Sequence, residues 1–211
     1  MARLTLDHST LSASAVALMV GAVRLHTGIA FRRRDDSIEI LHLASHCKVR
    51  AAPTAGWSYA VPVLDVIDLV LLAAYCVMLD RERPLIPYGL KFEESSLDDD
   101  GRFTPGPNES GMTCSTFVLA IFEWATIPLL SRESWPSRPD DTEAQLKLVA
   151  YLRTTDATKE HIEAVEREVG CMRIRPEEVA AATTTEPRPI GFVDAEVIGL
   201  EVLAEFDALR I

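Results

Sequence analysis

A long polar loop that ends at a cysteine is the feature that most constrains the fold of this chain. The loop begins at Pro87 and reaches Gly111, and the apolar stretch after it predicts a helix from Cys114 to about Ala125. Loops of this length in compact domains are usually functional. A thiol in the first turn of a helix ionises easily, because the macrodipole and the free amide groups there stabilise a thiolate. We therefore interpret Cys114 as a candidate nucleophile and expect its side chain to be exposed.

The rest of the pattern predicts an α+β chain. Strand-like segments occur before the loop, whereas helical periodicity dominates after it. Before the loop we expect a helix at Leu11–Ala22, strands at Arg24–Phe31 and Ser37–Val49, and a helix at Val63–Leu79. After the cysteine helix we expect helices at Asp140–Arg153 and Thr158–Gly170, a short helix opening at Arg175, and a last strand or helix between Ile190 and Ile211.

Histidines on the two predicted strands are candidates for a catalytic base, which a cysteine nucleophile usually needs. If the strands form a hairpin with Phe31 opposite Ser37, paired positions sum to 68 and His26 lies directly across from His42. An imidazole in that place can orient its neighbour, as the third member of a nucleophile, base and orienter array. His46 lies one strand repeat further along the same face and is the alternative to His42 as the orienting residue.

The composition of the 211 residues limits the class of partner. The net charge of -11 is opposite to what a general nucleic-acid binder or a ligand of anionic membranes needs. The apolar runs do not predict a membrane span, and we expect a cytoplasmic protein. The four cysteines match no zinc-site spacing and no glycine-rich phosphate loop is present, so we expect free thiols, no metal and no cofactor.

Several residues near the cysteine are candidates for substrate binding. Tyr88 either covers the core or places a phenol beside the thiol, and Thr113 and Ser115 flank the nucleophile. The loop segment from Lys91 to Ser110 is rich in acidic residues. If their field falls on the entrance of the site, it favours a neutral or cationic substrate; otherwise these acids only keep the loop soluble.

Three segments together resemble a known family. Pro87-Tyr88-Gly89, then Gly111-x-x-Cys114-Ser115-Thr116-Phe117-Val118 and Ile127-Pro128-Leu129, are similar to the nucleophile region of NlpC-like papain-fold peptidases. The histidine strand precedes the cysteine helix here, as in the circularly permuted branch of that family. This branch includes the lecithin:retinol acyltransferase-like proteins and many bacterial proteins without assigned activity.

The resemblance implies a fold and a set of roles. The fold is a permuted papain-like one, with an antiparallel sheet packed on the cysteine-bearing helix in residues 1–135. Residues 136–211 then form a helical C-terminal extension packed on that core, or part of a single domain. The implied roles are nucleophile for Cys114, general base for His26, polar third residue for His42 and active-site tyrosine for Tyr88. Wall-peptide hydrolases of this family commonly have Asp-Cys-Ser-Gly where this chain has Thr113-Cys114-Ser115-Thr116, so the residue that helps to hold a substrate amine differs.

The expected function is that of a thiol hydrolase, a cysteine peptidase or amidase that acts through a thioester on a peptide, amide or acyl substrate. The first alternative is an acyltransferase on the same site, which a wide apolar cleft would favour. The second is a non-catalytic interaction protein that retains the fold and binds a protein partner. A buried Cys114, or a His26 out of its reach, would favour that alternative.

Overall fold

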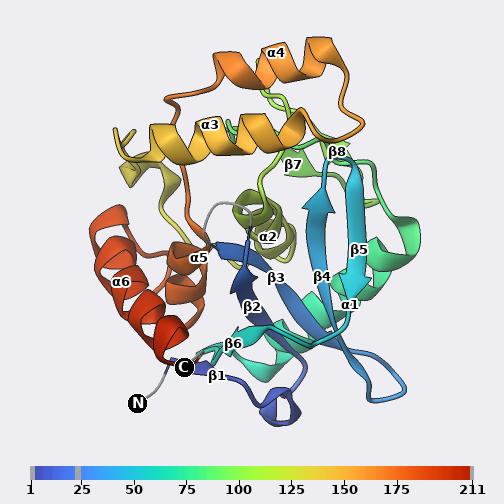
Figure 1. Cartoon of the computed structure of the whole chain (residues 1–211). Helices are drawn as coiled ribbons and strands as arrows, with labels where there is room; N and C mark the ends of the chain where they lie inside the picture. Colours follow the sequence, from blue (N-terminus) through green and yellow to red (C-terminus); the bar gives the residue numbers. More distant parts are fainter. Residues whose placement is uncertain (1–2, 22–24, 210–211) are drawn as a thin grey trace.

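The computed structural model describes residues 3–21 and 25–209 of the chain. In this part of the chain, six strands form one antiparallel sheet in the order β1-β6-β2-β3-β4-β5, and six α-helices lie behind it, beside it and across one end (Figure 1). The chain is therefore α+β, as the sequence pattern predicts. Ala22, Arg24 and Ile211, which bound three of the predicted elements, lie outside the described residues.

The bounds of the elements are as follows. The strands of the sheet are β1 (Leu4–Thr5), β2 (Ser14–Val20), β3 (Leu25–Arg32), β4 (Ile38–Ser45), β5 (Lys48–Ala52) and β6 (Ser58–Ala60). The α-helices are α1 (Val66–Glu82), α2 (Cys114–Trp124), α3 (Asp141–Leu152), α4 (Lys159–Arg167), α5 (Pro176–Thr183) and α6 (Phe192–Ala208). The shorter elements are the 3-10 turns η1 (His8–Thr10) and η2 (Arg132–Ser134) and a small ribbon of β7 (Ser96–Leu97) with β8 (Phe103–Thr104).

The helix predicted at Leu11–Ala22 is wrong, because Ser14–Val20 forms strand β2. This strand lies between β3 and β6 and is buried on both faces. Leu18 joins the main core, whereas Ala17 joins a smaller cluster on the other face of the sheet. A strand buried on both faces shows no polar and apolar alternation, so periodicity does not distinguish it from a buried helical segment.

The strand predicted at Ser37–Val49 is in fact two strands, β4 and β5. The chain turns at Cys47, whose φ of 53° places it in the left-handed region. A non-glycine residue rarely adopts that conformation, and for this reason the sequence gives no signal for the turn. The β6 strand was also absent from the expected elements, and it pairs with both β1 and β2.

The predicted register between the two histidine strands is wrong by two residues. β3 and β4 pair with Ile29 opposite Leu41, so paired positions sum to 70 rather than 68. Because side chains in a strand alternate with a period of two, a shift of two residues leaves each of them on its predicted face. His26 and His42 therefore share a face although they are not directly opposite.

The two faces of the sheet have different partners. Helices α1 and α2 pack on one face, in a core with Ile29, Phe31 and Leu41 of the central strands. The opposite face carries Ala30 and Ile40, covered by Trp57 and Tyr59. The second cluster has few large side chains, so the main core lies between the sheet and the helices.

The C-terminal helices pack directly on the sheet and on the cysteine helix. α5 contacts β2, β3 and α2, and α6 packs against α5 and β1. The Glu205 carboxylate of α6 accepts hydrogen bonds from the main-chain amides of Arg3 at 2.7 Å and Leu4 at 2.9 Å. α3 and α4 lie together across one end of the sheet, at the top of Figure 1.

Helices were predicted correctly in this half of the chain, and the tail, left open between strand and helix, is helix α6. None of the helices within residues 3–21 and 25–209 has the length and apolar character that crossing a membrane requires.

Candidate active site

Cys114 is the first residue of α2, as the sequence predicts. Thr113 is the N-cap of this helix, and its hydroxyl accepts a hydrogen bond from the Thr116 amide at 3.2 Å. In return the Thr116 hydroxyl accepts one from the Thr113 amide at 2.8 Å. Such a capping box satisfies two amides of the helix start and fixes where the helix begins. The cysteine is therefore held at a defined position in the first turn.

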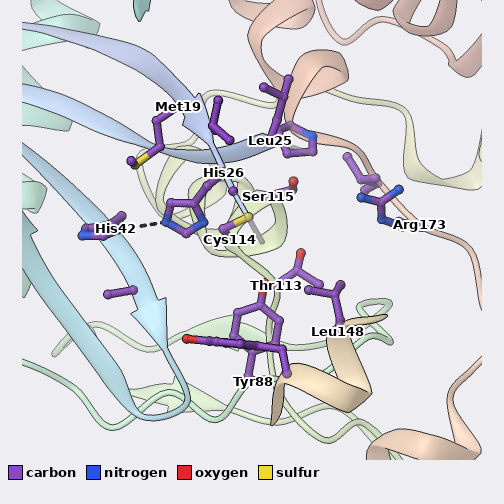
Figure 2. Close-up of a pocket in the computed structure, with 16 residues that line it drawn as sticks. Met19, Leu25, His26, His42, Tyr88, Thr113, Cys114, Ser115, Leu148 and Arg173 are labelled. Atoms are coloured by element: carbon purple, nitrogen blue, oxygen red, sulfur yellow. Dashed lines mark hydrogen bonds between the residues drawn. The ribbon is translucent and has the colours of Figure 1, made fainter. Parts of the chain in front are cut away.

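The expectation that Cys114 is exposed is wrong, because only 6 % of the residue is accessible to solvent. The thiol instead lines a cavity of about 230 Å³ at the end of the sheet (Figure 2). Leu148 and Tyr151 of α3 form part of the wall, together with Ile174. The C-terminal half of the chain thus covers the helix start, which local sequence patterns do not reveal.

The cavity brings together six of the candidate site residues that the sequence singled out, whereas His46, the alternative to His42, does not line it. His26, His42, Tyr88, Thr113 and Ser115 line it together with Cys114. They come from β3, β4, the loop before α2, and the first turn of α2 itself. Figure 2 shows His26 between His42 and Cys114.

The two histidines are directly hydrogen-bonded. The Nε2 atom of His26 lies 2.7 Å from the Nδ1 atom of His42, and the ring centroids are 5.0 Å apart with an angle of 74° between the planes. Gly28 allows this close approach, because a Cβ at that position would lie 2.6 Å from the Leu41 carbonyl oxygen and 2.9 Å from the His42 Cβ. The diagonal pair across the strands thus replaces the directly opposed pair that the predicted register implied.

His42 is held in its neutral form. Burial, the charge of His26 and the charge of Arg50 lower the pKa of His42 to about 3. When His26 is an imidazolium both of its nitrogens carry protons, and its Nε2–H donates to Nδ1 of the neutral His42. The other ring nitrogen of His26, Nδ1, lies toward Cys114 and can exchange a proton with the thiol (Figure 2).

Trp57 packs against both imidazoles, and the sequence reasoning missed it. Its ring centroid lies 5.8 Å from that of His26 and 5.5 Å from that of His42. The Nε2 atom of His42 is buried and has no hydrogen-bond partner among the described residues. The indole therefore excludes water from the far side of the histidine pair, which contributes to the low pKa of His42.

Charge interactions favour a thiolate at Cys114 and an imidazolium at His26. Burial raises the pKa of the Cys114 thiol, but the charge and hydrogen bond of His26, with help from the main chain of Thr27 and the Tyr88 phenol, lower it to about 7. Burial likewise lowers the pKa of His26, and the negative charge of Cys114 more than offsets this and raises it above 6.5. Each group stabilises the charged form of the other.

The other three cysteines behave in the opposite way. Burial raises the pKa of Cys47, Cys76 and Cys171, and in Cys171 it reaches about 11. All four thiols are free. Cys114 is thus the one cysteine whose surroundings favour the reactive thiolate.

Tyr88 is buried beside the nucleophile and is held by two further histidines. Its main-chain amide donates to Nδ1 of His46 at 3.3 Å, and its carbonyl oxygen lies 2.9 Å from Nε2 of His161. Burial and the charge of Cys114 raise the pKa of the Tyr88 phenol well above its ordinary value, so the hydroxyl stays protonated. His46, the alternative to His42, is bound to Tyr88 and not to His26.

The acidic loop does not contribute to the cavity. None of the described lining residues comes from the segment between Lys91 and Ser110. One of its acids holds the loop together, because the Glu109 carboxylate accepts hydrogen bonds from the main-chain amides of Glu93 and Glu94, each at 2.8 Å. These acids therefore do not line the cavity whose entrance their field was expected to reach. Arg173 lines the cavity instead, and no sequence motif marked it.

No group of three or more His, Cys, Asp and Glu side chains within the described ranges is arranged to hold a metal ion. Comparison of the chain with protein-family models, with curated proteins and with solved structures gave no match.

Proposed function

We propose that the protein is a thiol hydrolase that cleaves an amide or ester through a thioester on Cys114. The observation that carries this proposal is the placement of Cys114 at the start of α2, in one cavity with His26, whose Nε2 atom lies 2.7 Å from Nδ1 of His42. The pKa of Cys114, lowered to about 7 while burial raises those of the other three cysteines, agrees with this geometry. A cysteine nucleophile needs such a thiolate next to a base that is itself oriented by a third group. Cys114, His26 and His42 lie in that order in the cavity (Figure 2).

The acylation step follows from this geometry. His26 takes the thiol proton on Nδ1, and the thiolate attacks the substrate carbonyl to form the carbon–sulfur bond. The negative charge on the carbonyl oxygen is stabilised by main-chain amides of the first turn of α2, which lack helical partners. The tetrahedral intermediate collapses when His26 gives its proton to the leaving amine or alcohol, so that a thioester remains on Cys114.

Deacylation uses the same groups in reverse. His26, neutral again, takes a proton from a water molecule, and the oxygen of that water attacks the thioester carbonyl. The proton then returns to the Cys114 sulfur as the carboxylic acid leaves. His42 stays neutral throughout and accepts a hydrogen bond from His26 Nε2, which keeps the base in its productive tautomer.

The fold that we propose is the permuted papain-like one. Supporting this, the histidine strand β3 precedes the cysteine helix α2 in the chain, and an antiparallel sheet packs against that helix. The hydrogen-bonded pair of His26 and His42 on neighbouring strands also agrees with the roles that the resemblance implies.

The cavity volume favours a hydrolase of small substrates over an acyltransferase for long lipid chains. Ligand cavities for drug-sized molecules hold roughly 300–1,000 Å³, whereas this cavity holds about 230 Å³. The burial of Cys114, which is 6 % exposed, favours the non-catalytic alternative. Its hydrogen bond with His26 favours catalysis instead.

A small activated ester tests the proposal directly. With p-nitrophenyl acetate, we expect a burst of p-nitrophenol and an acetyl group on Cys114, detected by peptide mass spectrometry. Cys114→Ser and His26→Ala should lose both signals, whereas Cys171→Ser, the matched control, should keep them. If Cys114 is not acetylated, or if its acetylation is unchanged in His26→Ala, the hydrolase proposal is wrong and the non-catalytic alternative is favoured. Adding an amine acceptor then distinguishes hydrolysis from acyl transfer by the product formed.

A further inference from the structure

Arg173 is the residue of the cavity that carries a fixed charge. It lies in the segment between α4 and α5, and the other described lining residues are apolar, hydroxyl-bearing, thiol or histidine side chains, or glycine. In Figure 2, Arg173 lies on the opposite side of Cys114 from His26 and His42. A substrate bound to the thiol therefore has the base on one side and a guanidinium on the other.

The charge of Arg173 is only partly neutralised by the protein. Its Nη1 atom lies 2.9 Å from Oδ1 of Asp141, but the same oxygen also accepts from Nε of Arg175 at 2.9 Å. The second oxygen of Asp141 accepts from Nε of Arg138 at 2.8 Å. One carboxylate is thus shared among three guanidinium groups.

Arg173 differs from the other two arginines of this cluster. Arg138 has a second carboxylate in Glu178, and Arg175 has one in Asp140. For Arg173, Asp141 is the only ion-pair partner within the part of the chain that the structure describes.

The neighbouring carboxylate of Glu177 forms no ion pair with Arg173 among the described residues. Burial, together with the nearby charge of Glu178, raises the pKa of Glu177 although Arg173 and Arg175 oppose this shift. Arg173 remains a cation with guanidinium donors left over for a ligand, and its side chain is 16 % exposed.

The surroundings of Arg173 strengthen its attraction for an anion. Leu148, Ile174 and Pro176 are apolar and line the same cavity. Away from bulk water, an ion pair is screened less and is stronger than on the surface. The planar guanidinium matches a carboxylate, with which it forms two parallel hydrogen bonds.

We propose that the substrate is a small amide with a carboxylate close to the scissile bond, and that Arg173 binds this carboxylate. Short peptides cut next to their C-terminal residue and N-acyl amino acids have this chemistry. The proposal rests on the proposed thiol hydrolase function and adds the substrate class. It also reverses the preference for a cationic substrate that the acidic loop suggested.

Two alkylating reagents of similar size test this proposal without knowledge of the substrate. Iodoacetate carries a carboxylate where iodoacetamide carries a neutral amide, and both alkylate the same thiolate. The measurement is the ratio of their rates at Cys114, from peptide mass spectrometry near neutral pH. In Arg173→Gln the ratio of iodoacetate to iodoacetamide should fall by about tenfold, because the attracting charge is gone.

Matched variants separate this effect from a change in the fold. Arg175 pairs with the same Asp141 oxygen as Arg173 but does not line the cavity. Arg175→Gln removes an equal positive charge and should leave the ratio of iodoacetate to iodoacetamide rates unchanged. Arg173→Lys should also keep most of it. The iodoacetamide rate shows whether each variant retains its site, and Arg173→Met is the second neutral variant if Arg173→Gln does not fold.

The outcomes distinguish this inference from the proposed function. If Cys114 reacts rapidly with iodoacetamide but the ratio is unchanged in Arg173→Gln, the carboxylate site is wrong and the hydrolase proposal stands. An equal fall in Arg173→Gln and Arg175→Gln also overturns the carboxylate site. If iodoacetamide modifies Cys114 no faster than Cys47, the hydrolase proposal fails and the substrate class fails with it.

Discussion

The Nε2 atom of His26 lies 2.7 Å from the Nδ1 atom of His42, although the β3–β4 pairing does not place the two residues opposite one another. The hydrogen bond is diagonal across the two strands. It joins a histidine whose pKa is raised by Cys114 to one whose pKa burial lowers to about 3. The pair therefore has one member suited to carry a proton and one that stays neutral.

Replacing His42 should slow acylation without unfolding the protein. His42→Phe removes the acceptor for His26 Nε2 but retains a buried ring beside Trp57. We expect the rate of Cys114 acetylation by p-nitrophenyl acetate to fall by about 10²-fold, since the base loses its preferred tautomer. The thermal midpoint should change little, because the unpaired Nε2 of His42 also disappears. An unaltered acetylation rate would show that His42 has no orienting role.

Gly28 should tolerate no side chain. In Gly28→Ala the new Cβ would lie 2.6 Å from the Leu41 carbonyl oxygen, so the strands must move apart. We expect a loss of about 1–3 kcal/mol in the free energy of unfolding and slower acetylation, because the same movement separates His26 from His42. Urea unfolding monitored by circular dichroism gives the first quantity.

Gly199 is the matched control for this change. It is also buried, but in helix α6, and an added Cβ would have its nearest contact at 3.5 Å, from Glu177 Cγ. Gly199→Ala should be neutral or stabilising by up to about 1 kcal/mol, because alanine favours the helix. Equal losses in the two variants would mean that the close approach at Gly28 is not the cause.

The buried ion pairs beside the cavity should contribute strongly to stability. Arg138 is bound to Asp141 at 2.8 Å and to Glu178 at 2.5 Å, and all three side chains are 8 % exposed or less. Arg138→Met leaves Glu178 without its cation, and we expect a loss of about 3–5 kcal/mol. Lys147→Met, which breaks the exposed pair with Glu143, should cost less than about 1 kcal/mol. Similar small losses in both variants would contradict a structural role for the cluster.

The sequence predicted most helices of this fold because each has a clear apolar period or a capping signal. α2 begins at Cys114 because Thr113 and Thr116 form its capping box, and the expected helix started at the same residue. β2 was mistaken for a helix since both of its faces are buried, and β5 was missed since the turn at Cys47 has no sequence signature. Local periodicity does not distinguish a strand that is buried on both faces from a buried helical segment.

The candidate site was predictable where it depends on strand faces and a helix start. His26 and His42 meet despite the wrong register, because an error of two residues preserves the face of each strand. Trp57 and Arg173 were not predictable in this way. They come from the turn after β5 and from the segment before α5. Only tertiary packing brings Trp57 against the two histidines and Arg173 to the cavity.

The pH dependence of Cys114 alkylation measures whether His26 activates this thiol. A lowered pKa means that the thiolate forms as the pH rises through about 7, so the iodoacetamide rate should reach half its plateau there. In His26→Ala the influence of burial remains while the main lowering causes are lost, and the midpoint should move to the ordinary 9.0 or above. The thiolate fraction at pH 7 then drops about 50-fold, although the more basic thiolate is more nucleophilic, so the rate should fall by at least about fivefold.

The exposed His8, changed to alanine, is the control and should leave the midpoint near 7. The measurement is the rate at each of the four cysteines between pH 5 and 10, by peptide mass spectrometry. We expect that Cys114 alone has a midpoint near 7 and that, of the two variants, only His26→Ala raises it. A midpoint for Cys114 near 9 in the unaltered protein, or one that His26→Ala leaves in place, would contradict the activation of this thiol by His26.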